Sequence, residues 1–185
     1  MLKSIRRKGN LMKARNYRPV RGQPYTRKEY IKGFPPPKIV KFTMGDTRAT
    51  FEYEARLISL KKAQIRHVAL EATRVATNRI LTDKLENNYY MQIMPYPHVI
   101  LRENKMIFGA HADRLQQGMR ASFGRTIGTA ARVEPGQTLI IVRVNANGLE
   151  AAKESLKRGN AKLPIPCRIV IEKIAKKDTA KVDAE

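Results

Sequence analysis

The side chains of this sequence that are best suited to chemistry are its cations. Thirty-seven Lys and Arg stand against 16 Asp and Glu, which gives a net charge of +21. The excess is concentrated in residues 3–32, which contain eleven basic residues and one acidic residue, Glu29. Lys and Arg bind phosphate oxygens, and the counterions released on phosphate neutralisation supply much of the affinity of proteins for nucleic acids. The composition therefore predicts a nucleic-acid-binding protein.

Residues 1–37 are predicted to form an extended basic arm with little regular structure, because turn formers such as Pro19, Gly22 and Pro24 interrupt it. The same breaks argue against a basic amphipathic helix on a membrane surface. Aromatic residues that can stack on bases interleave with the charges; they are Tyr17, Tyr25, Tyr30 and Phe34. A disordered solubilising tail is the alternative for this segment.

Residues that could support catalysis or bind a metal are scarce. His67, His98 and His111 have no partners at metal-ligand spacing, and only His111 is a candidate functional histidine. Cys167 has no nearby base and indicates a reducing, cytosolic setting. No phosphate-binding glycine motif occurs, although residues 124–128 could present backbone N–H groups to a phosphate. We therefore expect no enzyme, no cofactor and no metal, and the apolar runs are too short for a membrane span.

The elements that must position the cations are predicted from residue 38 onward. Strands are expected over residues 38–44 and 48–57, joined as a hairpin by Gly45 and Asp46. A helix over about 61–85, capped by Ser59, follows, and strands over 89–94 and 98–101 come next. The apolar stripe predicted for that helix consists of Ile65, Val68, Ala69, Ala72, Val75, Ala76 and Ile80.

Residues 102–132 show no single period, and we expect a long irregular functional loop there. A strand over 138–145 follows, with Ile140, Val142 and Val144 on one face. A capping-box spacing at 147–150 predicts a second helix that ends just before Gly159. A closing strand over 168–174 and a flexible tail over 175–185 complete the chain. The pattern predicts an α+β body over 38–174, with a mixed sheet and two helices.

Several stretches resemble the universal large-subunit ribosomal protein family called L16 in bacteria and L10e in archaea and eukaryotes. They are residues 21–30 (RGQPYTRKEY), 64–67 (QIRH), 97–106 (PHVILRENKM) and 112–120 (ADRLQQGMR), followed by Phe123-Gly124 and residues 128–133. The resemblance extends over about residues 14–174, and the archaeal form is the more similar one. His111 stands where the family often has glycine.

The resemblance implies a hammerhead-type α+β fold in the cytoplasmic ribosome, without enzymatic activity. The implied partners are 23S-type rRNA, neighbouring ribosomal proteins and the tRNA acceptor arm, with 5S rRNA as a further candidate and no homo-oligomer. Residues expected to contact rRNA are Arg6, Arg7, Lys8, Arg15, Arg18, Arg21, Arg27, Lys28, Lys32, Arg66, Arg120, Arg125 and Arg132. Residues expected to face tRNA and the peptidyl transferase centre are Arg102, Asn104, Lys105, Met106, Gly109, His111, Arg114, Gln117 and Gly118.

Two other classes of protein would share the charge. An RNA-modifying enzyme would need a cofactor cradle or a paired acid and base, and the sequence shows neither. A chromatin-like DNA-coating protein would fit the charge but not the long, glycine-spaced segment 102–132.

Overall fold

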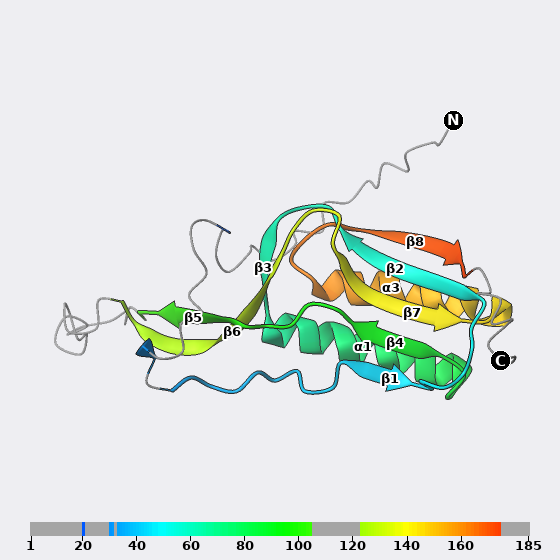
Figure 1. Cartoon of the computed structure of the whole chain (residues 1–185), viewed down its shortest axis with the longest axis horizontal. Helices are drawn as coiled ribbons and strands as arrows, with labels where there is room; N and C mark the ends of the chain where they lie inside the picture. The colour runs from blue at the N-terminus through cyan, green and yellow to red at the C-terminus, as the bar shows by residue number, and fades with distance from the viewer. Residues whose placement is uncertain (1–19, 21–29, 32, 105–122, 175–185) are drawn as a thin grey trace, which may run out of the picture.

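The computed structural model describes residues 20, 30–31, 33–104 and 123–174 (Figure 1). Most of the predicted arm, the central part of the predicted loop and the predicted tail lie outside these residues.

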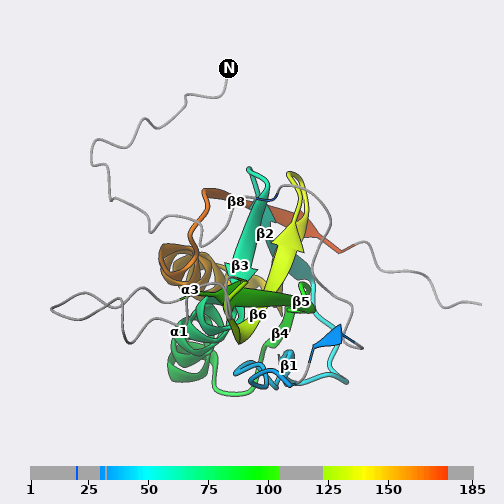
Figure 2. The ribbon, with the colours of Figure 1, turned by 90° about the vertical axis from the view of Figure 1, so that its left-hand side faces the viewer.

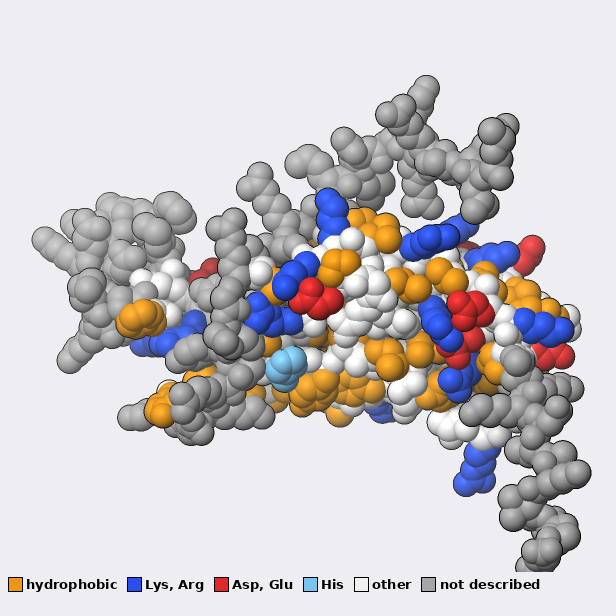
Figure 3. All heavy atoms as spheres, turned by 45° about the horizontal axis from the view of Figure 1, so that its top comes forward, with side chains coloured by type: hydrophobic (Ala, Val, Ile, Leu, Met, Phe, Trp, Pro, Cys, Tyr) orange, Lys and Arg blue, Asp and Glu red, His pale blue; other side chains and the backbone are white. Residues whose placement is uncertain are grey.

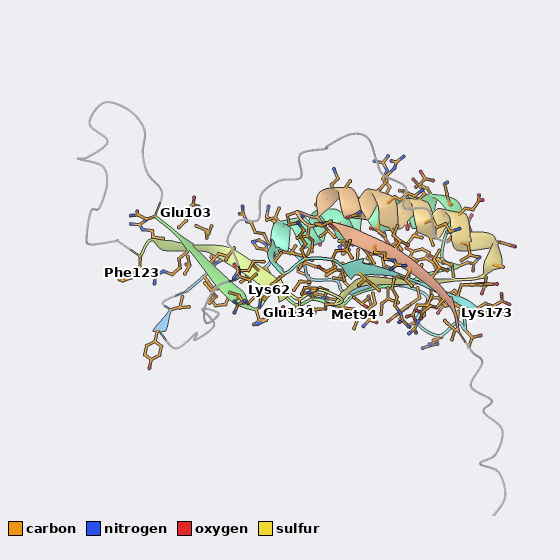
Figure 4. The ribbon with its side chains drawn as sticks, turned by 90° about the horizontal axis from the view of Figure 1, so that it is seen from above. Lys62, Met94, Glu103, Phe123, Glu134 and Lys173 are labelled. Carbon is orange, nitrogen blue, oxygen red and sulfur yellow. The ribbon has the colours of Figure 1, made fainter. Side chains whose placement is uncertain are left out.

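A five-stranded sheet forms the larger part of the body, in the order β1-β4-β7-β2-β8. Its strands are β1 (Thr43–Gly45), β4 (Tyr90–Ile93), β7 (Thr138–Val144), β2 (Tyr53–Ser59) and β8 (Cys167–Lys173). Two helices, α1 (His67–Leu85) and α3 (Leu149–Lys162), lie together on one side of it (Figure 4). Neither described helix is long and apolar enough to cross a membrane.

A second, three-stranded sheet extends from one end of the body, in the order β3-β6-β5. Its strands are β3 (Ala63–Arg66), β6 (Arg125–Val133) and β5 (Val99–Glu103). Viewed from this end, the three strands cross in front of the helices (Figure 2). The β5–β6 hairpin reaches furthest from the helices and carries both ends of the segment 105–122 (Figure 1).

Alternating apolar residues build the core beneath the helices. Ala55 of β2 pairs in register with Val142 of β7, which pairs with Met91 of β4, and all three are fully buried. Leu81 and Leu156 from the two helices belong to the same buried cluster. Full burial of a side chain of this size stabilises a fold by about 1.5–3 kcal/mol. The predicted inward face of residues 138–145 is confirmed, because Ile140, Val142 and Val144 are all buried.

The α+β class with two helices is confirmed, but the predicted mixed sheet is not observed. Every strand pair among the described residues is antiparallel, and the strands divide into two sheets. The predicted hairpin at Gly45 and Asp46 is also wrong, because β1 pairs with β4 and β2 pairs with β7 and β8. The local turn signal at Gly45 is therefore outweighed by pairing between segments that are distant in sequence.

The first helix begins later than predicted. Residues 63–66 form β3, whose Ile65 is buried against β6, and Ser59 ends β2 with its hydroxyl donating to the Lys61 carbonyl at 2.8 Å. The predicted apolar stripe is mostly not the buried face, since Val68 and Val75 are 40% and 49% exposed. The residues of α1 that are buried are His67, Leu70, Thr73, Thr77, Ile80 and Leu81.

The second helix runs past its predicted end. Gly159 lies inside α3 and is buried, and the helix continues to Lys162. A Cβ atom added at Gly159 would lie 2.4 Å from Oγ1 of Thr77, so the glycine allows α1 and α3 to approach closely. The helix begins after Gly148 without a side-chain cap, so the predicted capping box does not form.

Candidate nucleic-acid interface

The β5–β6 hairpin corrects the prediction of one irregular loop over residues 102–132. Residues 125–133 form strand β6, in which Thr129 pairs with Ile100 and Arg125 with Glu103, with a register shift after Leu101. The β-branched residues of this strand favour an extended backbone, and its interspersed glycines hid the pattern in the sequence. Residues 125–128 therefore belong to strand β6, where they pair with β5, and do not form a phosphate-binding loop.

The tip of the hairpin is closed by a small set of contacts. One guanidinium nitrogen of Arg102 donates to the carbonyl of Gly124 at 2.9 Å, and the same guanidinium lies 5.9 Å from the ring centroid of Phe123. Gly124 has φ +72°, and a Cβ atom there would lie 2.3 Å from the carbonyl carbon of Glu103. Only glycine can therefore make this turn without displacing the opposite strand.

The last described residues of the arm run beside this hairpin. The hydroxyl of Thr126 in β6 donates to the carbonyl of Gly33 at 3.0 Å. The backbone N–H of Lys38 donates to Nδ1 of His67, the first residue of α1, at 2.9 Å. Gly33 near the end of the arm, and the strands β5 and β6 that flank the segment 105–122, therefore lie at the same end of the molecule.

His67 has a structural role here and is not a candidate ligand. Its ring is buried, and a Cβ atom added at Gly128 would lie 2.6 Å from its Nε2, so the glycine lets the ring lie directly against β6. Because Nδ1 accepts a hydrogen bond, the neutral ring carries its proton on Nε2. Burial, and then the charges of Arg66 and Lys38, lower the pKa of His67 below its ordinary value of 6.5.

The predicted RNA-binding residues that the structure describes lie on the small sheet. Arg66 ends β3, and Arg132 of β6 pairs in register with Gln64, so Arg66 and Arg132 lie on one face of neighbouring strands. Arg125 is exposed at the start of β6, and Arg102 is half-buried near the end of β5. Asn104 is exposed next to the segment 105–122.

The other predicted contact residues lie outside the described part of the chain. They are Arg6, Arg7, Lys8, Arg15, Arg18, Arg21, Arg27, Lys28, Lys32 and Arg120 for rRNA, and Lys105, Met106, Gly109, His111, Arg114, Gln117 and Gly118 for tRNA.

Two arginines on the uncovered face of the large sheet, Arg56 and Arg143, form ion pairs with carboxylates. Arg143 donates to one oxygen of Glu54 at 2.8 Å, Arg56 donates to the other, and Arg56 also lies 3.3 Å from Glu172. Burial alone would raise the pKa of Glu54, but hydrogen bonds from Arg56 and Arg143 and their charges outweigh it and lower the pKa. Basic and acidic side chains accordingly lie side by side on this face (Figure 3).

The described residues with potential for catalysis or metal binding are dispersed. No group of three or more His, Cys, Asp and Glu within the described ranges could hold a metal ion. His98 is exposed, with Nδ1 3.2 Å from the carbonyl of Tyr96, and the half-buried Cys167 has its Sγ 3.6 Å from the carbonyl of Ile165. Among the described residues, the Lys and Arg side chains are therefore the groups best suited to bind a ligand.

Phe123 was not among the predicted site residues, although it stands at the hairpin tip (Figure 4). Its side chain is 80% exposed. An aromatic residue directly before a glycine, in a stretch rich in arginine, was the available signal in the sequence.

Comparison with known proteins identifies the family. The family model for ribosomal protein L16p/L10e matches residues 20–170. The large ribosomal subunit protein uL16 of Staphylothermus marinus is 52% identical over 163 residues, covering 88% of this chain and 94% of its own. The protein of the same name from Saccharolobus solfataricus is 53% identical over 164 residues, covering 87% and 92% of the two chains.

These likenesses confirm the resemblance seen in the sequence motifs. They also confirm two expectations that followed from it: the protein is a ribosomal protein and not an enzyme, and it is located in the cytoplasmic ribosome. The match spans both sheets, both helices and the hairpin that carries the segment 105–122. This chain belongs to the ribosomal protein L16p/L10e family.

Proposed function

We propose that this large-subunit protein binds 23S-type rRNA with its basic arm and its small sheet. We further propose that the segment between β5 and β6 helps to position the acceptor end of tRNA near the peptidyl transferase centre. The neighbouring ribosomal proteins and 5S rRNA are the other partners in this proposal. The relatives named above are proteins of the large ribosomal subunit, which supports this assignment.

The observation that carries the proposal is the contact between the end of the arm and the hairpin. Gly33 accepts a hydrogen bond from Thr126, and Lys38 donates one to His67. The segment with eleven basic residues therefore joins the body beside the hairpin. RNA that contacts the end of the arm would lie near the small sheet, which carries Arg66, Arg125 and Arg132, and arginine side chains commonly contact phosphates.

Arg125 differs in its ion pairs from the central arginines of the large sheet. On the large sheet, Glu54 holds both Arg56 and Arg143. Among the described residues, no carboxylate forms an ion pair with Arg125 at the hairpin tip. An arginine can hold two phosphate oxygens with its planar fork, which makes such a residue well suited to an RNA backbone.

A test of this proposal uses Lys105→Ala and Arg125→Ala in cells that carry the variant as their only copy. We expect less incorporation into large subunits, or slower translation by those subunits, because each change removes one phosphate contact. We expect little change in the melting temperature of purified Arg125→Ala, since Arg125 is exposed and substitutions of exposed residues usually alter stability by less than about 0.5 kcal/mol.

Lys153→Ala serves as the matched control, because Lys153 is an exposed lysine on α3, away from the small sheet. Normal subunits and normal translation in both test variants would contradict the proposal. So would a defect in Lys153→Ala as large as that in Arg125→Ala, because the effect would then follow total charge and not the hairpin end.

A further inference from the structure

Among the described residues, Phe123 has the most exposed of the large apolar side chains. Most large apolar side chains of the described body are buried, whereas Phe123 is 80% exposed at the far tip of the β5–β6 hairpin (Figure 4). One face of the ring lies under the guanidinium of Arg102, 5.9 Å from its centroid. A flat apolar surface is thereby presented at the end of the molecule where the arm joins the body.

The hairpin fixes the backbone beside this ring and the guanidinium that lies over it. Arg102 is held by its hydrogen bond to the carbonyl of Gly124, the residue that follows Phe123. The backbone of Gly124 packs so closely on Glu103 that a Cβ atom cannot be accommodated. Arg102 and Glu103 in turn pair with Thr126 and Arg125 across the hairpin. A ring held in this way loses little conformational entropy when a ligand stacks on it.

The chemistry around the ring matches a nucleotide. Every base has a π-face, and bases stack on aromatic side chains without a strict sequence requirement. Arg125 lies two residues further on and is exposed, and although Glu103 is its cross-strand neighbour, no ion pair joins the two. The register places Arg125 on the face of the hairpin opposite to Arg102, so Arg125 would bind a phosphate on the side of the ring away from Arg102.

We propose that Phe123 is a stacking platform for one unpaired RNA base, with Arg102 behind the ring and Arg125 at the adjoining phosphate. This inference rests on the proposed function, since it requires RNA at the hairpin end. The base can come from rRNA or from tRNA, and the experiment below separates the two sources.

The first measurement uses the full chain and a short single-stranded RNA with 2-aminopurine at its centre. The dissociation constant is obtained from the fluorescence change, because 2-aminopurine is quenched when it stacks. Phe123→Ala is expected to weaken binding by about tenfold or more, as is typical for loss of one base–aromatic stack. Phe123→Trp is expected to keep the affinity and the quenching, whereas Phe123→Leu, apolar but not flat, is expected to lose both.

Salt dependence separates the ring from the charge. Phe123→Ala is expected to leave the slope of log affinity against log salt unchanged, because stacking releases no counterions. Arg125→Ala is expected to reduce the slope by about one, because one phosphate contact is lost. Tyr96→Ala is the matched control, because Tyr96 is 57% exposed but packs against Phe42 away from the hairpin, and it is expected to change neither quantity.

Ultraviolet crosslinking of assembled large subunits identifies the source of the base. A nucleotide attached to the peptide containing Phe123 without tRNA indicates rRNA, and an adduct that requires bound tRNA indicates tRNA. Either adduct supports the platform. An adduct to a neighbouring protein, or no adduct at all, overturns it.

The two proposals fail in different ways. Should Phe123→Ala bind the RNA as tightly as the unchanged chain, the platform is wrong while RNA binding stands. Should the unchanged chain bind no RNA at all, the proposed function itself fails, and the platform with it.

Discussion

At the scale of single residues, His67 shows how a polar side chain can join two parts of the chain. It lies at the first position of α1, accepts the Lys38 N–H and packs against Gly128 of β6. The sequence offered no functional role for His67 and gave no sign of these contacts. They connect residues that are far apart in the chain, and no local pattern encodes them.

The lowered pKa of His67 predicts a pH dependence of stability. The unfolded chain binds a proton at this residue near pH 6.5, whereas the folded protein binds it only at lower pH. The contribution of neutral His67 to the free energy of unfolding is therefore fully present above pH 6.5. It decreases as the pH falls from there toward the lower pKa that His67 has in the folded protein. We expect the free energy of unfolding to fall by up to about 1.4 kcal/mol per pH unit in this range.

Denaturant unfolding of His67→Asn measures this contribution. Asn can accept the Lys38 N–H but does not titrate, so the variant is expected to be less stable at neutral pH and to have a flatter pH profile. An equally steep decrease in both proteins between about pH 7 and pH 5 would show that another group is responsible.

At the scale of elements, the contact between α1 and α3 explains why the predicted apolar stripe of α1 is only partly buried. The buried face of α1 includes Thr73 and Thr77, because α3 presents Gly159 to them and leaves room only for small side chains. Hydrophobicity alone favoured the face of Val68 and Val75, which is largely exposed. A pattern of hydrophobic residues therefore does not predict a helix contact that depends on small side chains.

Gly159→Ala tests the closeness of this contact. Helix propensity favours Ala over Gly by about 1 kcal/mol. The added methyl group must displace Thr77, however, and overpacking of this kind costs about 1–3 kcal/mol. We expect a net loss of about 1 kcal/mol, seen as a melting temperature roughly 2–4 °C lower.

A double-mutant cycle gives the control. Adding Thr77→Ala removes the atom that the new methyl group would strike, so the two substitutions together should cost less than the sum of their separate effects. An unchanged or higher melting temperature for Gly159→Ala alone would mean that the helices have room to separate.

The strands were easier to predict than their pairing. Strands near residues 89–94, 98–101, 138–145 and 168–174 were expected and are observed as β4, β5, β7 and β8. The partner of β1 could not be predicted, because the Gly45 turn signal is local whereas the pairing with β4 spans the whole of α1. Strand β6 was missed because Gly124 and Gly128, which serve its close contacts, resemble loop residues in a sequence.

At the scale of the whole molecule, composition alone indicated the class of partner. A net charge of +21 predicts a polyanion, and the family match places the chain among ribosomal proteins. Composition could not show that the end of the arm and the hairpin lie together, since that depends on the contacts of Gly33 and Lys38. The central claim is therefore that rRNA phosphates bind the cations of the arm and of the small sheet.

The salt dependence of rRNA binding by the full chain tests that claim most directly. If about ten phosphates are neutralised, a plot of log affinity against log salt concentration should have a slope of roughly −7 to −9. Large-subunit rRNA should also bind more tightly than double-stranded DNA of similar length, which separates this protein from a general DNA-coating protein. An affinity that hardly changes with salt, or one that is equal for rRNA and DNA, would contradict the account.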